Sequence, residues 1–310
     1  MSLDLSGPLQ VFASANDERQ RQGLPPFYRL LVLAQQPGAV ATSAGFQLVA
    51  EQAWGETDPA QIDTLLIPGG LGEQAQCQNK PLLAWLGEAA PQVRRLGSVC
   101  SGALILAAAG LLDGRRATTH WALAGQFRRR FPQVDLQIEQ LLCHDGNLLS
   151  SGGAQAGLDL CLYLIGQQAG AELARQVANA LVFDSQRGSQ ARYAPLLPSQ
   201  AVQDSQLATL LQWMQRHQGE AIDLKRLADQ ASCSPRTLLR RFKAGTGLTP
   251  NDYLQRLRIS SAQQALLNPA NSLEQIAAQV GYADRATFAK LFKQLCEETP
   301  GAFRRRMRQA

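Results

Sequence analysis

Residues 97–121 have the sequence GSVCSGALILAAAGLLDGRRATTHW, in which a short apolar run ends at a cysteine and a second apolar run follows. Residues 95–99 are typical of a buried strand, and residues 101–109, rich in alanine and leucine, are typical of a buried helix. Cys100 therefore lies at a predicted strand-to-helix turn. The positive end of a helix lowers the pKa of a nearby thiol, so this position favours a thiolate.

Strand-like and helix-like segments alternate on both sides of Cys100. Strands are expected at 28–34, 64–67 and 95–99, with short β-prone runs at 117–119 and 147–150, and helices at 82–90 and 101–109. Such alternation is typical of a parallel sheet covered by helices. We therefore expect an α/β domain with a doubly wound, mostly parallel sheet, whose ligand sites lie beyond the carboxyl ends of the strands.

Three motifs follow predicted strands and fall at that edge: Pro68-Gly69-Gly70, Cys100-Ser101-Gly102 and Thr119-His120-Trp121. The glycines allow backbone N–H groups to turn toward a ligand oxygen. His120 is suited to act as the partner of Cys100 if the fold brings the two together. The alternative is a tight turn, a small buried cysteine and a hydrogen-bonded histidine at a strand end. We favour a pocket over a working catalyst.

Residues 1–185 resemble the PfpI-like branch of the class I glutamine amidotransferase-like fold, which is flavodoxin-like. In that resemblance Cys100 takes the nucleophile-elbow position, His120 the partner-histidine position and Asp4 of LDLSGP the acidic position that faces the cysteine. Glutaminases carry an acid two residues after the histidine, where this chain has Ala122. The resemblance thus implies a ligand pocket without catalytic residues, lined by Asp4, Gly69, Gly70, Cys100, Ser101 and His120.

The resemblance also implies a strand ahead of the LDLSGP helix. Members of the family begin with such a strand, and it is central in their sheet. Without an interior strand, both neighbouring strands keep unpaired backbone groups, each costing on the order of 1–3 kcal/mol when buried. We therefore expect the DNA upstream of Met1 to encode a short apolar strand in frame.

The last third of the chain contains a degenerate repeat, in which residues 224–253 match residues 273–303. Leu227-Ala228 corresponds to Ile276-Ala277, and Thr237, Phe242-Lys243, Thr249-Pro250 and Tyr253 correspond to Thr287, Phe292-Lys293, Thr299-Pro300 and Phe303. Internal repeats of this kind indicate repeated structural units.

Capping signals predict a helix, a short turn and a second helix in each repeat. Asp223 and Ser272 are placed to cap the first helices, and Ser234-Pro235 opens the second helix of the first repeat. Apolar pairs four residues apart face inward: Leu238 with Phe242, and Phe288 with Phe292. The side chains left outward for DNA are Arg236, Thr237, Arg240, Arg241, Arg285, Thr287 and Lys290.

This region, residues 206–306, resembles the AraC-type DNA-binding domain, an all-α domain with two helix-turn-helix units. The resemblance implies recognition helices at 235–244 and 284–294, joined by one long helix at 250–267. Leu239 stands where many members place a polar side chain, so we expect the base contact there to be apolar or absent. The alternative is a small helical bundle with a basic surface and no role in DNA binding.

Charge is distributed unevenly along the chain. Residues 1–205 carry 14 lysines and arginines against 17 acids, whereas residues 206–310 carry 16 against 8. A basic C-terminal third indicates a polyanionic partner. Apolar periodicity fades toward residue 200, and Gln190 matches the junction pattern of the family, so we expect domains at 1–188 and 206–310 and a linker at 189–205.

Composition excludes several classes of protein. No apolar run approaches the roughly 18 residues of a membrane span, and the first residues lack a signal-peptide pattern, so we expect a cytoplasmic protein without a membrane role. The six cysteines form no CxxC pair and there are only three histidines, so we expect neither a metal site nor another cofactor.

A PfpI-like domain ahead of an AraC-type domain resembles the GlxA-like transcriptional regulators of bacteria. The resemblance implies a ligand-responsive activator that assembles as a homodimer. Its partners would be promoter DNA, RNA polymerase and a small effector such as an amino acid or nitrogenous compound. One alternative is a PfpI-like hydrolase or lyase that uses Cys100. Another is a DNA-binding protein whose first domain only dimerises.

Overall fold

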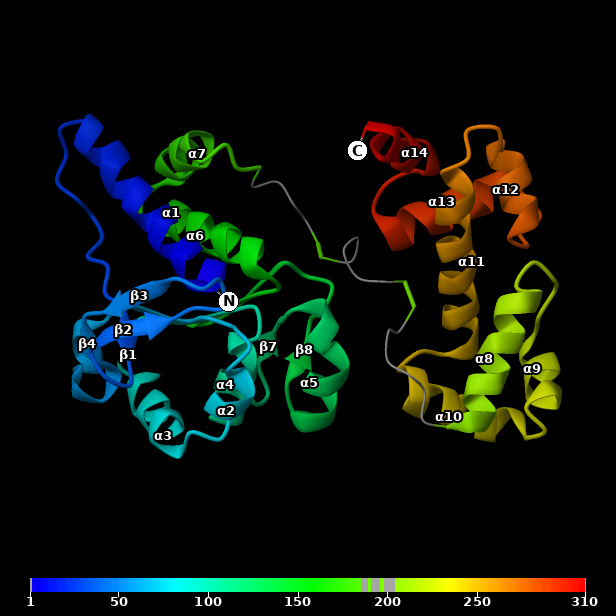
Figure 1. The fold of residues 1–310 in the computed structure, drawn as a ribbon, viewed down its shortest axis with the longest axis horizontal. Coiled ribbons are helices and arrows are strands. Elements are labelled where there is room, and N and C mark those ends of the chain that lie inside the picture. The colour runs from blue at the N-terminus through cyan, green and yellow to red at the C-terminus, as the bar shows by residue number, and fades with distance from the viewer. Residues whose placement is uncertain (1, 185–188, 191–195, 198–203, 310) are drawn as a thin grey trace. The chain divides into compact units, whose positions relative to one another are not determined.

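The chain consists of two compact units, Met1–Gln190 and Ala191–Ala310. The computed structural model describes residues 2–184, 189–190, 196–197 and 204–309. Figure 1 shows that the first unit is a sheet between layers of helices and that the second is helical. The predicted fold class is confirmed.

A four-stranded sheet forms the centre of the first unit, in the order β5-β6-β10-β9. The strands β5, β6 and β10 are parallel, and β9 is antiparallel to β10. Their bounds are Thr64–Ile67 for β5, Arg95–Val99 for β6, Leu148–Ser151 for β10 and Leu142–Asp145 for β9. The strands β5 and β6 have the bounds that the apolar runs predict.

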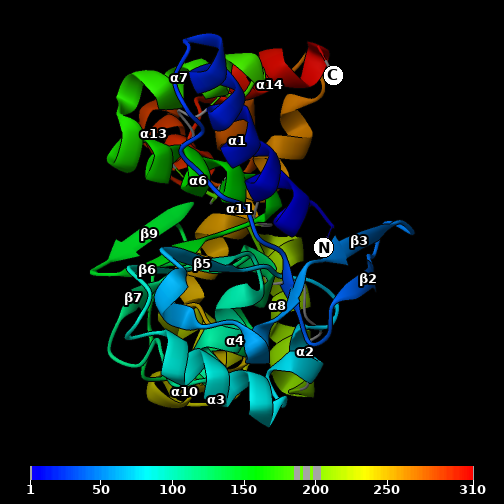
Figure 2. The same ribbon diagram turned by 90° about the vertical axis from the view of Figure 1, so that its left-hand side faces the viewer.

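Three small two-stranded sheets accompany it. The strand β1 pairs in parallel with β4, and β7 pairs in parallel with β8, whereas β2 and β3 form an antiparallel hairpin that the sequence analysis missed. Figure 2 shows this hairpin projecting from the unit. The bounds are Leu33–Ala34 for β1, Gly38–Ala41 for β2, Gln47–Ala50 for β3, Gln52–Ala53 for β4, Arg116–Ala117 for β7 and Asp135–Leu136 for β8.

The prediction of a full strand at 28–34 is wrong, because only Leu33–Ala34 is a strand. A strand is defined by the ladder of hydrogen bonds to its neighbour. The Val32 carbonyl accepts a hydrogen bond from Glu51 N at 2.9 Å, but residues 29–31 make no backbone hydrogen bond to any described residue. Apolar sequence alone therefore did not create the strand.

Helices cover both faces of the sheet, as Figures 1 and 2 show. One apolar core contains Val11, Leu160 and Val177 from α1, α6 and α7, and the other contains Leu86, Leu104 and Phe127 from α3, α4 and α5. The bounds are Ser2–Arg21 for α1, Glu73–Gln76 for α2, Lys80–Ala89 for α3, Gly102–Ala108 for α4, Ala124–Arg130 for α5, Ala154–Ala169 for α6 and Ala171–Ala180 for α7.

The described part of the second unit is made of helices. The predicted caps form: Asp223 and Ser234 each accept a backbone N–H with the side chain, and Ser272 makes a capping box with Gln275. Asp284, predicted as the first residue of a recognition helix, is instead its N-cap. The bounds are Ser205–His217 for α8, Leu224–Gln230 for α9, Pro235–Thr246 for α10, Pro250–Leu266 for α11, Leu273–Gln279 for α12, Arg285–Cys296 for α13 and Pro300–Gln309 for α14.

Two apolar cores hold this unit together, one for each repeat. Phe242 of α10 and Phe292 of α13 are fully buried at their centres. The long helix α11 belongs to both cores, with Leu257 in the first and Ile259 in the second. Within the described ranges, no helix combines the length and apolar character needed to cross a membrane.

Candidate ligand site and DNA-binding surface

Cys100 forms a sharp turn between β6 and α4. Its φ is +56°, in the left-handed region that non-glycine residues adopt only when the surroundings hold them there. Cys100 N donates to Ser151 O at 3.0 Å, and Cys100 O accepts from Thr119 Oγ1 at 2.8 Å. Neighbouring strand ends therefore fix the turn, and Cys100 is 6% exposed.

The Pro68-Gly69-Gly70 turn closes on the same point. A Cβ on Gly69 would lie 2.7 Å from Asp4 Oδ2 and 2.6 Å from Ser101 N, so only glycine fits between these groups. Gly70 N donates to Ser101 Oγ at 2.9 Å. The structure thus brings Asp4, from the first turn of α1, beside the turns that follow β5 and β6.

Burial dominates the electrostatics of Cys100 and Asp4. It raises the pKa of the Cys100 thiol to about 12, and the negative charge of Asp4 contributes in the same direction. The Ser101 N–H, at the N-terminus of the seven-residue helix α4, lowers this pKa. Its effect is smaller than that of burial. The expectation of a lowered thiol pKa is therefore wrong. Burial also raises the pKa of Asp4.

His120 is half-buried at the rim of the site. Burial lowers its pKa, whereas the carboxylate of Asp4 raises it, so the neutral imidazole is favoured. His120 Nδ1 accepts a hydrogen bond from Ala122 N at 3.2 Å, which leaves the proton on Nε2. Ala122 stands where glutaminases have an acid. Here its backbone N–H orients the imidazole ring of His120.

Gln190 supports this region, and sequence reasoning placed it in the linker. It is 3% exposed and packs in the first unit, where Gln190 Nε2 donates to Thr119 O at 2.8 Å and Ile138 O at 2.7 Å. Gln190 Oε1 accepts from Trp121 N at 3.1 Å. One buried amide thus fixes the backbone on both sides of His120. Its place in the junction pattern was the only signal in the sequence.

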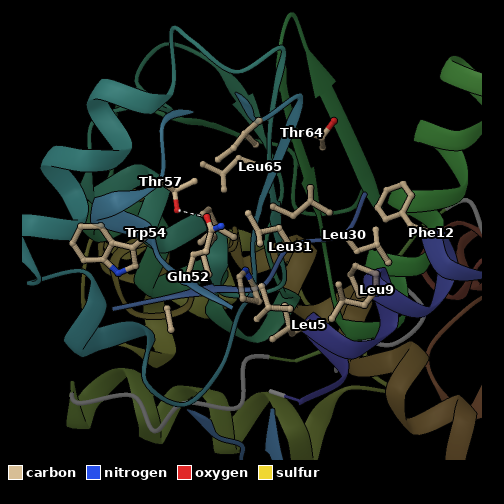
Figure 3. A pocket seen from close by; sticks show the side chains of 18 of the residues that line it. Leu5, Leu9, Phe12, Leu30, Leu31, Gln52, Trp54, Thr57, Thr64 and Leu65 are labelled. Atoms are coloured by element: carbon tan, nitrogen blue, oxygen red, sulfur yellow. Dashed lines mark hydrogen bonds between the residues drawn. The ribbon is translucent and has the colours of Figure 1, made fainter. Parts of the chain in front are cut away.

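The arrangement can bind a small polar ligand more readily than it can attack one. The six predicted residues lie together, and the thiol and the imidazole are both neutral near pH 7. A cleft of about 1220 Å³ lies beside them, and of the six only Asp4 lines it. Figure 3 shows this cleft between α1, residues 30–31 and β5. No group of side chains suited to a metal ion occurs in the described ranges.

The second unit presents the predicted recognition helices. Both inward pairs are buried, and Arg236, Arg240 and Lys290 are exposed with no ion pair to any described residue. Arg285 is also exposed but lies 2.7 Å from Glu274 Oε1. Thr237 and Thr287 lie in the first turns of α10 and α13. Their backbone N–H groups donate to the side chains of the N-cap residues Ser234 and Asp284.

Arg241 has a different environment. Its guanidinium lies 2.9 Å from Asp204 Oδ2 and 3.0 Å from Asp204 Oδ1, and it donates to Gln206 Oε1 at 2.7 Å. Because Asp204 also caps α8, this ion pair joins α8 to α10. Sequence reasoning gave Arg241 an outward place beside Arg240, whereas the structure gives it partners inside the unit.

An α/β domain with a cysteine elbow, followed by two helix-turn-helix units, defines a PfpI-type domain joined to an AraC-type domain. A sequence model of the DJ-1/PfpI family matches residues 2–167, and one of the helix-turn-helix domain matches residues 227–306. The chain belongs to the DJ-1/PfpI family and carries an AraC-type helix-turn-helix domain after it. Both predicted resemblances are confirmed.

Similar proteins include regulators and an enzyme. The HTH-type transcriptional regulator GlxA of Rhizobium meliloti (strain 1021) is 29% identical over 309 residues, covering 96% of this chain and 92% of GlxA. Isonitrile hydratase of Pseudomonas putida is 34% identical over 176 residues, covering 56% of this chain and 70% of the hydratase. The crystal structure of a ThiJ/PfpI family protein from Pseudomonas syringae has a TM-score of 0.51 at 25% identity, covering 74% of this chain and 86% of that chain.

Proposed function

We propose that this protein is a transcriptional regulator that binds promoter DNA through α10 and α13. The observation that carries the proposal is the pair of capped helices on which Arg236, Arg240 and Lys290 are exposed and form no ion pair with a described residue. A helix of this kind enters the major groove, where arginine binds guanine with two hydrogen bonds. The similarity to GlxA over nearly the whole chain supports the same function.

The proposal assigns effector binding to residues 1–188, the connection to 189–205 and DNA binding to 206–310. The effector would be a small polar metabolite, such as an amino acid or nitrogenous compound, held by Asp4, Gly69, Gly70, Cys100, Ser101 and His120. Its binding would control promoter activation by a cytoplasmic homodimer that contacts RNA polymerase. The contacts and electrostatic interactions among these six residues support their acting as one site.

DNA binding is tested with the full chain and a duplex selected by that chain from a random library. Because bound cations release counterions, the logarithm of affinity should fall linearly with the logarithm of salt concentration, with a slope of about −0.9 per phosphate neutralised. Arg236→Ala should cost about 1–3 kcal/mol on the selected duplex and less on random DNA. No binding even at low salt would refute the proposal.

A cysteine-dependent enzyme is the second candidate, because the Cys100 elbow and the similarity to isonitrile hydratase favour it. The raised pKa of Cys100 and the neutral His120 count against it, since neither generates a thiolate near pH 7. Cys100→Ser should keep both the fold and the DNA affinity. Turnover of an isonitrile in the ordinary range of about 1–10³ per second, abolished by Cys100→Ser, would establish the enzyme instead.

A further inference from the structure

We propose that Arg258 is a positioning residue that fixes the orientation of the two recognition helices, α10 and α13, relative to each other. This role rests on the proposed function, since it would set the separation of the two DNA segments that those helices contact. Arg258 lies on α11, the helix that belongs to both cores of the second unit. Figure 1 shows α11 running from α10 toward α12 and α13.

On one side, Arg258 binds the turn between α8 and α9. Its Nε donates to Gln218 O and its Nη2 donates to Glu220 O, each at 2.8 Å. Three residues further along α11, Ser261 Oγ donates to Gln218 Oε1, also at 2.8 Å. Hydrogen bonds from a charged donor are stronger than neutral ones, and the planar guanidinium gives them a fixed geometry. Arg258 therefore holds this turn against α11.

On the other side, the same guanidinium contacts the turn that leads into α13. It lies over the ring of Tyr282, with 5.5 Å between Arg258 Cζ and the ring centroid. This arrangement is a favourable cation–π contact. Tyr282 in turn contacts Phe288 of α13, with 5.9 Å between the two ring centroids. One side chain of α11 thus connects the α8–α9 turn to the second recognition helix.

Two glycines allow the α8–α9 turn and the α12–α13 turn to approach each other. A Cβ on Gly219 would lie 2.8 Å from the carbonyl oxygen of Gln279, the last residue of α12. A Cβ on Gly281 would lie 3.0 Å from Gln218 O. The φ of Gly281 is +84°, which also favours glycine. The backbones of the two turns therefore meet directly, so a change at this junction would move one helix-turn-helix unit against the other.

The environment of Arg258 distinguishes it from the arginines assigned to DNA. It is half-buried, and burial lowers the pKa of its guanidinium. Its donors are directed to backbone carbonyls of the same unit, so they serve the junction rather than phosphate. Arg256, two positions earlier on α11, is also half-buried and makes no ion pair with a described residue. It provides a control with the same charge on the same helix.

The test measures the affinity of the full chain for three duplexes. The first is the selected duplex, the second has one base pair inserted between the two contacted segments, and the third has one segment scrambled. Arg258→Met removes the donors and keeps an apolar stem, whereas Gly219→Ala keeps every charge and forces the two turns apart. Arg256→Met is the matched control. The melting temperature of each variant shows whether it is folded.

The wild type should bind the selected duplex about tenfold more tightly than the duplex with the insertion, because rigidly joined recognition helices accept one separation. Arg258→Met and Gly219→Ala should each reduce this preference to about threefold or less and bind the scrambled duplex as the wild type does. Arg256→Met should keep the preference.

An unchanged preference in Arg258→Met, or an equal loss of affinity on all three duplexes, would refute the positioning role. If Arg258→Met does not fold, Gly219→Ala decides, and an unchanged preference in that variant would refute the role. Wild-type protein that binds none of the duplexes would refute the proposed function itself, and the positioning role with it.

Discussion

Asp4 shows how a single buried carboxyl affects the electrostatics of the candidate ligand site. It is 1% exposed and faces Cys100, Gly69 and His120, so its charge raises the pKa of the thiol and also that of the imidazole. The family resemblance placed these residues together from the sequence. The sequence did not show that burial would outweigh the helix terminus at Cys100, because burial depends on residues distant in the chain.

Asp4→Asn is expected to stabilise the protein in a pH-dependent way. Burial raises the pKa of Asp4 in the folded state, so the protonated form is favoured, and its contribution to stability is lost as pH rises through that pKa. Asparagine stays neutral, so the stability of the variant relative to the wild type should rise with pH, over a range that begins at the ordinary carboxyl pKa of 3.8 and ends above the raised pKa of Asp4. Thermal denaturation across this range measures it. The exposed Asp17→Asn is the control, and a gain independent of pH would contradict the explanation.

Gly69→Ala is expected to destabilise the site by overpacking. Its Cβ would lie 2.6 Å from Ser101 N and 2.7 Å from Asp4 Oδ2, and the Ser101 backbone cannot move aside without disturbing the Cys100 turn. Overpacking of this kind costs about 1–3 kcal/mol. The matched control is Gly72→Ala, where a Cβ would meet no heavy atom within 4 Å. Denaturant unfolding should separate the two variants, and equal midpoints would show that the turn is not tightly constrained.

Helices were predictable where the sequence marks their start and their buried side. The helices α10 and α13 have a cap at the start and a buried aromatic at the centre, and their observed starts agree with the prediction within one residue. By contrast, the strand at 28–34 and the hairpin β2–β3 depend on which partner lies alongside. The turn around Gly45, between the runs 38–41 and 47–50, was a missed signal for the hairpin.

Two adjacent arginines of α10 should separate DNA binding from stability. Arg241 pairs with Asp204, and both side chains are 31% exposed, so Arg241→Ala should lower the midpoint of denaturant unfolding with little effect on DNA affinity. Arg240 is exposed and makes no ion pair with a described residue, so Arg240→Ala should weaken DNA binding at unchanged stability. Fluorescence anisotropy and chemical denaturation of both variants measure the two effects. Weaker DNA binding at unchanged stability in Arg241→Ala would instead assign Arg241 to the DNA-binding surface.

At the scale of the whole molecule, the sequence predicted two domains but could not place Gln190. The buried amide of Gln190 lies at the last residue of the first unit and bonds to backbone on both sides of His120. The contacts between Gln190 and the candidate ligand site thus span 69 and 71 positions of the sequence. No local pattern encodes contacts of that range.

Gln190→Ala is expected to loosen the His120 loop while leaving the recognition helices intact. It leaves Trp121 N, the buried Thr119 carbonyl and the partly buried Ile138 carbonyl without this partner, and each unmade bond costs on the order of 1–3 kcal/mol when buried. Amide exchange of residues 118–121 should accelerate at least tenfold, with no change in α10 or α13. Ser189→Ala, which removes a hydroxyl at the neighbouring position, is the control. Acceleration in the recognition helices as well would contradict a local role.

The helix α11 has a consequence for the layout of promoters. Because its 17 residues contribute to both cores of the second unit, the two recognition helices cannot change their spacing independently. Once one recognition helix is bound to its half-site, the other is held near the duplex at a high effective concentration. Two weak half-sites therefore act as one strong site only when both face the same side of the duplex. One turn of B-DNA is about 10–10.5 base pairs. Inserting five base pairs between the half-sites would turn the second half-site to the opposite side of the duplex and reduce the overall affinity to that of one half-site. Inserting ten base pairs would return both half-sites to the same side of the duplex but leave them too far apart.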